Sequence, residues 1–302
     1  MKRKLLGNVK KNVGLYIMLA VPVTWYIIFK YIPMYGLQIA FKKFNPTLGI
    51  MRSPWIGLTY FKQFFNSYYF EQILWNTISL SLFTMLIGFP MPIILALIIN
   101  EIKNTHFKKA VQNITYLPNF LSVVVIVSML TIFSNKDYGL FNQIRNFFGQ
   151  EPVDFMSKPI WFKPLYVFSN VWQYMGFNAI IYIAALAGVD QELYEAASID
   201  GASRFQKIIH ISLPGILDTI LILFIMRIGS LMSVGFEKVY LMQNSVNLSS
   251  SEIISTFIYK NGIQKGQFSY STAVGLFNSV INFILLISAN FVSKKTADTG
   301  LW

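Results

Sequence analysis

Hydrophobic positions along this 302-residue chain gather into six long runs that more polar stretches of varying length separate. A helix that crosses the hydrocarbon core of a membrane needs about 20 apolar residues, and each run is about that long. The runs cover residues 13–32, 75–99, 114–133, 162–186, 216–234 and 272–292. The pattern therefore predicts an all-α polytopic membrane bundle of six transmembrane helices, in which residues 1–302 form one transmembrane domain.

The first run has a second interpretation, a cleaved signal peptide, because basic residues precede it. Its apolar core is longer than the core of a signal sequence, and no Ala-x-Ala cleavage site follows it. We therefore expect the segment to be retained as the first span.

Composition supports a membrane protein. Hydrophobic residues make up 54% of the chain and charged residues 13%, against about 25% charged residues in a typical soluble domain. The formal net charge of +12 raises the question of nucleic-acid binding. Such binding needs a basic face on a soluble module, and six spans leave no module of that kind. Basic loops beside anionic lipid headgroups explain the charge better.

Lysine and arginine also favour one orientation. Five of them precede the first run and a pair follows the last run. Because positively charged segments stay on the cytoplasmic side, we expect a multi-pass membrane protein with both termini in the cytoplasm.

Several kinds of chemistry have no residues to support them. The chain has no cysteine, and its two histidines, His106 and His210, lie far apart in segments that we assign to loops. We expect no metal site and no catalytic residue. There is no G-x-x-x-x-G-K-[ST] phosphate loop, so we expect no bound cofactor, and any ATP must be hydrolysed by another polypeptide.

The positions of the acidic residues bear on the mechanism. No carboxylate falls in the middle of a predicted span, whereas ion-coupled carriers need titratable groups within their helices. A secondary carrier remains an alternative, although this distribution argues against it. A membrane-embedded transferase is another alternative, but it would need a cluster of His, Cys or acidic residues at the interface.

Arg227 is the exception, because it falls near the middle of the fifth predicted span. A charge at that depth should face protein or a water-filled cavity. Two roles stay open at this point. The guanidinium either donates hydrogen bonds to a polar substrate in a cavity, or it pairs with a neighbouring subunit or a helix carbonyl.

The most polar loop, residues 189–214, predicts a helix–turn–helix elbow. Residues 193–199 favour a short helix with Glu195 near its start, where the helix dipole stabilises negative charge. Asp200 and Gly201 then form a turn, and Ser203 can cap a second helix. The second helix is apolar on one side, which suits either docking to a protein or lying on the membrane surface.

The same loop resembles the signature loop of permeases of binding-protein-dependent ABC importers, which reads E-A-A-x-x-D-G-A. The resemblance implies that the short helix is a coupling helix that seats in a cleft of a cytoplasmic ATPase. The coupling residues that it implies are Glu195, Ala196, Ala197, Asp200, Gly201, Ala202 and Phe205.

Other segments resemble the maltose-type branch of sugar permeases that handles complex oligo- and polysaccharides. They are residues 29–36, 41–46, 53–57, 116–118, 273–278 and 301–302. The resemblance implies a permease that works as a heterodimer with a second related permease, together with an ATPase dimer and an extracytoplasmic solute-binding protein. Such a permease translocates the oligosaccharides that the binding protein delivers, by alternating access driven by the separate ATPase.

Sugar recognition combines aromatic faces with hydrogen-bonding groups, and the fourth run supplies both. Tyr174, Phe177 and Asn178 share one helix face by their spacing, and the resemblance to maltose-type permeases points to the first two. In the sixth run Asn278 and Asn282 share a face, where packing between helices is the alternative role. The expected substrate contacts are Gln173, Tyr174, Phe177, Asn178, Arg227 and Asn278.

Overall fold

The computed structural model describes residues 12–297 and 299–301. Within them the regular secondary structure is helical, apart from one isolated antiparallel bridge between Lys42 and Trp55. The chain divides into two compact units. Unit 1 holds the described residues up to Ser67 together with Ile258–Leu276. Unit 2 holds Tyr68–Phe257 and the described residues from Phe277 onward.

Unit 1 begins with a continuous apolar helical segment, Val13–Phe41, that extends well beyond residue 32. Its elements are α2 (Val13–Tyr26), the π-turn η1 (Ile27–Tyr31), α3 (Ile32–Met34) and the 3₁₀ turn η2 (Tyr35–Phe41). No side chain of α2 is buried within the chain. The short helices α4 (Gly49–Arg52) and α5 (Thr59–Phe65), the π-turn η5 (Lys260–Gln264) and the start of α19 (Phe268–Ala297) complete the unit.

Unit 2 contains most of the helices. In chain order they are α6 (Phe70–Gly88), α7 (Pro90–Asn100), α8 (Thr105–Tyr116), η3 (Leu117–Phe120), α9 (Val123–Phe133), α10 (Leu140–Phe147), α11 (Pro159–Ala187), α12 (Gln191–Ile199), α13 (Arg204–Lys207), η4 (Ile208–Ser212), α14 (Leu213–Gly215), α15 (Leu217–Gly229), α16 (Phe236–Met242), α17 (Leu248–Ser251) and the remainder of α19. Between α17 and η5 lies α18 (Ile254–Tyr259).

Three helices of the described chain have the length and apolarity of membrane spans, and the number is up to six if each of three bent helix pairs counts as one span. Val13–Phe41, Phe70–Asn100 and Phe268–Lys295 each qualify as one helix. The other three are pairs of helices with a sharp bend, as follows: Thr105–Phe120 with Val123–Phe133 at 98°, Pro159–Ala187 with Gln191–Ile199 at 73°, and Arg204–Gly215 with Leu217–Gly229 at 62°. The all-α membrane architecture expected from the hydrophobic pattern is confirmed.

Two spans differ from their predicted form. The third breaks after η3, because Leu121 and Ser122 are extended and the Ser122 hydroxyl caps α9 by accepting a hydrogen bond from the Val125 amide. The fifth ends at Gly229 instead of residue 234, where the Ser230 hydroxyl donates to the Arg227 carbonyl at 3.1 Å. A hydropathy pattern does not report where a helix is capped. The pattern therefore predicted one uninterrupted helix across each of these two breaks.

The histidines also lie elsewhere than expected. His106 is in the first turn of α8, and His210 is in η4, so neither occupies a loop. Among residues 12–297 and 299–301, no group of three His, Cys, Asp or Glu side chains is placed to hold a metal ion.

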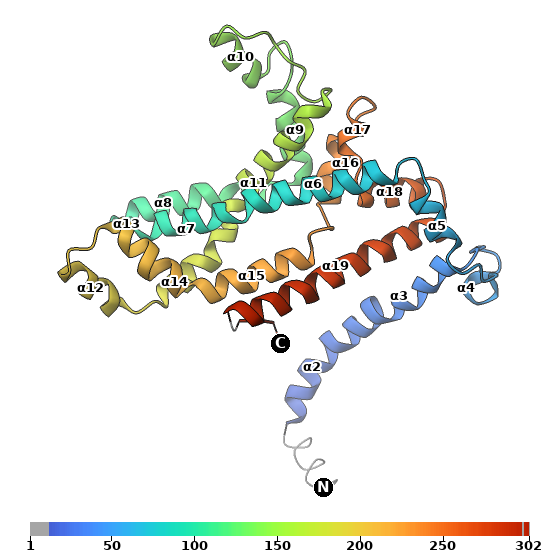
Figure 1. The fold of residues 1–302 in the computed structure, drawn as a ribbon, viewed down its shortest axis with the longest axis horizontal. Coiled ribbons are helices and arrows are strands. Elements are labelled where there is room, and N and C mark those ends of the chain that lie inside the picture. Colours follow the sequence, from blue (N-terminus) through green and yellow to red (C-terminus); the bar gives the residue numbers. More distant parts are fainter. Residues whose placement is uncertain (1–11, 298, 302) are drawn as a thin grey trace. The chain divides into compact units, whose positions relative to one another are not determined.

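Helix α11 is the central helix of unit 2 and packs against α6, α7 and α8. Its approach to α8 is very close, because a Cβ added at Gly176 would lie 2.0 Å from the Thr115 carbonyl oxygen. Figure 1 shows α12 and α13 at one end of this unit, near the junction of α7 and α8, and α16, α17 and α10 at the other end. The two ends carry the features considered next.

Candidate functional site

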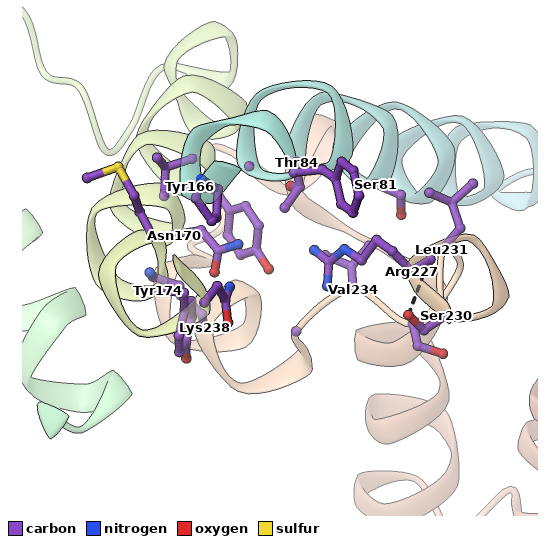
Figure 2. Close-up of a pocket in the computed structure, with 18 of the residues that line it drawn as sticks. Ser81, Thr84, Tyr166, Asn170, Tyr174, Arg227, Ser230, Leu231, Val234 and Lys238 are labelled. Carbon is purple, nitrogen blue, oxygen red and sulfur yellow. Dashed lines mark hydrogen bonds between the residues drawn. The ribbon is translucent and has the colours of Figure 1, made fainter. Parts of the chain in front are cut away.

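A cavity of about 730 Å³ lies within unit 2. Helices α6, α11, α15 and α16 supply its walls (Figure 2). On α6, the Thr84 hydroxyl donates a hydrogen bond to the Leu80 carbonyl of the same helix. Ser81 differs, because its buried hydroxyl has no hydrogen-bond partner among the described residues. The wall therefore offers at least one unused polar group.

The α11 wall of the cavity carries a regular stripe of polar side chains. Tyr166, Asn170, Tyr174, Asn178 and Tyr182 all line the cavity, and they recur every four residues. Residues four apart share a helix face, and each such step advances about 6 Å along the axis. Phenol rings and amides thus alternate along one wall, which suits a ligand with both apolar ring faces and hydroxyl groups.

Arg227 enters the cavity from the last turn of α15. Figure 2 shows its guanidinium projecting into the open centre. Within the described part of the chain, the side chain takes part in no ion pair or hydrogen bond. It lies at the end of its helix instead of mid-span, because α15 stops at Gly229. Leu231 and Val234, which follow the helix, also line the cavity.

Three predicted contacts do not line the cavity. Gln173 is buried, donates to the Leu121 carbonyl at 3.2 Å and accepts from Lys238 at 3.2 Å. The Phe177 ring packs edge-on against Phe120 and is not among the residues that line the cavity. Asn278 lies in α19 with a buried side-chain oxygen that has no partner among the described residues.

The structure adds cavity residues that the sequence interpretation missed. They include Tyr166, Asn170, Glu237 and Lys238. The four-residue spacing in the fourth run is a signal that would have found the first two. Glu237 and Lys238 lie beyond the predicted end of the fifth span, and their position depends on how α16 folds back onto α9 and α11.

The elbow, residues 189–214, has the predicted helix–turn–helix form. Asp190 caps α12 by accepting from the Glu192 amide at 3.0 Å, and Gly201 adopts a φ of +77°. Ser203 and Gln206 form a reciprocal capping box at the start of α13. One detail was wrong: Glu195 is the fifth residue of α12, and Glu192 occupies the first turn.

Contacts within the elbow hold its two arms together. The hydroxyls of Tyr194 and Ser212 are 2.9 Å apart, and the Lys207 ammonium donates to the Ser198 hydroxyl at 2.6 Å. Apolar side chains nevertheless point outward, since Ile199 is 88% exposed. Leu193 and Phe205 are exposed as well, at 53% and 70%. An ordered element with an uncovered apolar surface fits docking to a partner.

Comparison with known proteins identifies relatives among membrane transport proteins. Residues 88–298 match the family described as "Binding-protein-dependent transport system inner membrane component". Protein LplB of Bacillus subtilis is 44% identical over 98% of this chain and 93% of its own length. The polygalacturonan/rhamnogalacturonan transport system permease protein YteP of the same organism is 41% identical over 100% of this chain and 94% of its own.

A solved structure is similar over almost the same length. It is a bacterial ABC transporter involved in the import of the acidic polysaccharide alginate. The TM-score is 0.90 at 39% identity, covering 97% of this chain and 99% of the matched chain. The chain described here belongs to the family of inner membrane components of binding-protein-dependent transport systems, as the permease subunit of an ABC importer that works with a second permease, an ATPase and a solute-binding protein.

Proposed function

We propose that this permease translocates acidic oligosaccharides, handed over by the solute-binding protein, through the cavity of unit 2. The observation that carries the proposal is the Arg227 guanidinium, which projects into the cavity without an acidic partner among the described residues. ATP is hydrolysed by the partner ATPase subunits, and this chain binds no cofactor of its own.

Physical chemistry favours a carboxylate as the partner of Arg227. A guanidinium presents a planar fork of donors that matches the two oxygens of a carboxylate. The alternating tyrosines and asparagines of α11, among them Tyr174 and Asn178, line the cavity and then face the rings and hydroxyls of the sugar chain. The names of two relatives, one for polygalacturonan and rhamnogalacturonan and one for alginate, support cargo of this class.

The six predicted contacts take different roles in this proposal. Tyr174, Asn178 and Arg227 touch the sugar. Gln173 positions neighbouring groups through its bonds to Leu121 and Lys238. Phe177 and Asn278 act in packing.

Replacement of Arg227 tests the proposal against a structural role. Arg227→Met should assemble with its partners yet lose uptake of an acidic oligosaccharide by about 10- to 100-fold, the value of one hydrogen bond to a charged group. Arg227→Lys should lose less, because it keeps the charge without the fork. When the carboxyl groups of the same oligosaccharide are reduced to alcohols, its uptake by Arg227→Met should differ little from its uptake by the parental chain.

The measurements are complex yield and uptake into proteoliposomes that contain the second permease, the ATPase and the binding protein. A structural role for Arg227 predicts a lower complex yield, because a buried partner on the second permease would lose its counter-charge. Parental yield together with parental uptake of the acidic cargo would refute both roles.

The orientation with both termini in the cytoplasm is part of the proposal. Its support is that the C-terminal tail contacts the start of α15, the helix that follows the elbow: the Thr299 hydroxyl donates to Asp218 at 2.8 Å. Lys294 and Lys295 close α19 on the same side, as expected if basic residues remain inside.

Single cysteines test this orientation, because the chain has none of its own. A cysteine at Tyr138, which is 63% exposed after α9, should react with an impermeant maleimide added to intact cells. Cysteines at Arg204 and Lys295 should react only after the cells are permeabilised. Labelling of the Arg204 position in intact cells would overturn the orientation.

A further inference from the structure

A second cation shares the cavity with Arg227. Lys238, on α16, lines the cavity although its side chain is only 4% exposed. Its ammonium donates to the Gln173 side-chain oxygen at 3.2 Å and lies 5.9 Å from the centroid of the Tyr166 ring. An ammonium has three N–H donors, and no further hydrogen bond occupies them within the described chain.

Within the part of the chain that the structure describes, no carboxylate pairs with the Lys238 ammonium. Glu237 is its neighbour and also lines the cavity, but the two side chains form no ion pair. The other ionisable groups that line the cavity are Tyr166, Tyr174 and Tyr182 from α11 and Arg227 from α15. Helix α9, which packs on α16, has no titratable side chain. Burial without a partner lowers the pKa of the Lys238 ammonium to about 8.

A structural tie accounts for only part of this arrangement. The chain of hydrogen bonds from Lys238 through Gln173 to the Leu121 carbonyl joins α16 and α11 to the break in the third span. A neutral side chain could make the same tie, and it would avoid the cost of burying an unpaired charge. The tie therefore does not explain why the buried side chain is a charged one, whereas binding of an anion does.

We infer that Lys238 is a second carboxylate-binding residue of this cavity, which together with Arg227 selects acidic over neutral oligosaccharides. The inference rests on the proposed function and extends it to a residue outside the predicted spans. The cargo carboxylate supplies the missing counter-charge by accepting from the free N–H donors of Lys238. The link to Gln173 holds the ammonium at the cavity wall, so little conformational entropy remains to be lost on binding.

The charge of Lys238 makes a pH dependence part of the inference. A lysine with a lowered pKa is charged below that pKa and neutral above it. At pH 9, one unit above a pKa of about 8, about a tenth of the empty sites carry the charge. Stimulation of the ATPase by acidic cargo should therefore need more cargo at pH 9 than at pH 7. Lys238→Arg should abolish this dependence, because arginine stays protonated throughout.

The experiment uses the full complex in proteoliposomes, with the binding protein loaded with a uronic-acid oligosaccharide or with its carboxyl-reduced counterpart. Lys238→Met should lower stimulation by the acidic sugar about 10- to 100-fold and leave stimulation by the neutral sugar within about twofold. Lys238→Arg should restore the response to the acidic sugar at pH 7. Comparing the two sugars in each variant corrects for any loss of folded complex.

Lys163 provides a matched control. It is a partly buried lysine of α11 that donates to the Ser79 hydroxyl at 2.7 Å and does not line the cavity. Lys163→Met should leave the ratio of acidic to neutral stimulation unchanged. An equal change in this control and in Lys238→Met would assign the effect to general loss of buried lysine and overturn the inference.

Failure of the inference differs from failure of the proposed function. The decisive quantity is the ratio of ATPase stimulation by the acidic sugar to stimulation by the neutral sugar. If Lys238→Met keeps the parental ratio while Arg227→Met loses it, Lys238 is only a structural tie and the proposed function stands. If the unmodified complex does not discriminate between the two sugars, the proposed function itself is wrong. A pH profile that is the same for the parental chain and Lys238→Arg also contradicts the inference.

Discussion

Replacing Gly201 with valine is expected to uncouple transport from ATP hydrolysis while leaving the protein in the membrane. Gly201 has a φ of +77° at the end of α12. Its amide donates to the Ser198 carbonyl at 3.2 Å, and the Ala202 amide donates to the Ala197 carbonyl at 2.9 Å. These two bonds form a Schellman motif, which depends on a left-handed residue at this point.

Backbone conformation alone causes the expected loss. A Cβ at Gly201 would meet nothing within 4 Å, so no steric clash is involved. A left-handed conformation costs an ordinary residue roughly 1–2 kcal/mol, and a branched Cβ makes it less favourable. That cost corresponds to a factor of about 5 to 30 in the population of the native elbow. We propose that α12 seats in the ATPase, so the population of docked complex should fall accordingly.

The measurements are ATPase co-purification and uptake, with two comparison variants. Gly201→Asn should retain most activity, because asparagine tolerates the left-handed region. Gly149→Val places the same strain at a φ of +69°, also in open space, in the connection between α10 and α11. It should leave coupling intact. Normal uptake and normal co-purification in Gly201→Val would show that the turn does not control docking.

The turn and the second cap of the elbow could be predicted because their signals are local, whereas the start of α12 was placed two residues too late. Ser203 caps the helix that follows it and Gly201 ends the helix before it, and neither depends on the rest of the chain. The six apolar runs were predictable for a similar reason, since hydrocarbon thickness sets their length. Such features follow from short stretches of sequence.

The bends within the spans, and the positions of several residues at the cavity, depend on contacts that the hydrophobic pattern does not show. The break at Ser122 lies inside an apolar run, and only the capping bond to Val125 reveals it. Lys238 would be assigned to a polar loop from its position, yet α16 packs on α9 and α11 and buries it. Phe177 has the spacing of a cavity residue, but Phe120 holds its ring elsewhere. Tertiary packing decided these outcomes.

Replacing Gly176, the one glycine of α11, with alanine is expected to destabilise unit 2. A Cβ there would lie 2.0 Å from the carbonyl oxygen and 2.4 Å from the carbonyl carbon of Thr115. Backbone atoms cannot rotate away as a side chain does, so α8 and α11 must separate. Overpacking of this kind costs typically 1–3 kcal/mol, and backbone displacement places this site at or above the upper end.

The separation should also affect the cavity, because Tyr174 and Asn178 flank Gly176 on α11. We expect Gly176→Ala to lower both the thermal unfolding temperature of the purified complex and its yield. Gly88→Ala serves as the control, since its Cβ would make only an ordinary contact of 3.7 Å with Val171 and alanine favours a helix by about 0.5–1 kcal/mol. An unfolding temperature for Gly176→Ala equal to that of Gly88→Ala would mean that α8 and α11 do not approach as closely as the structure shows.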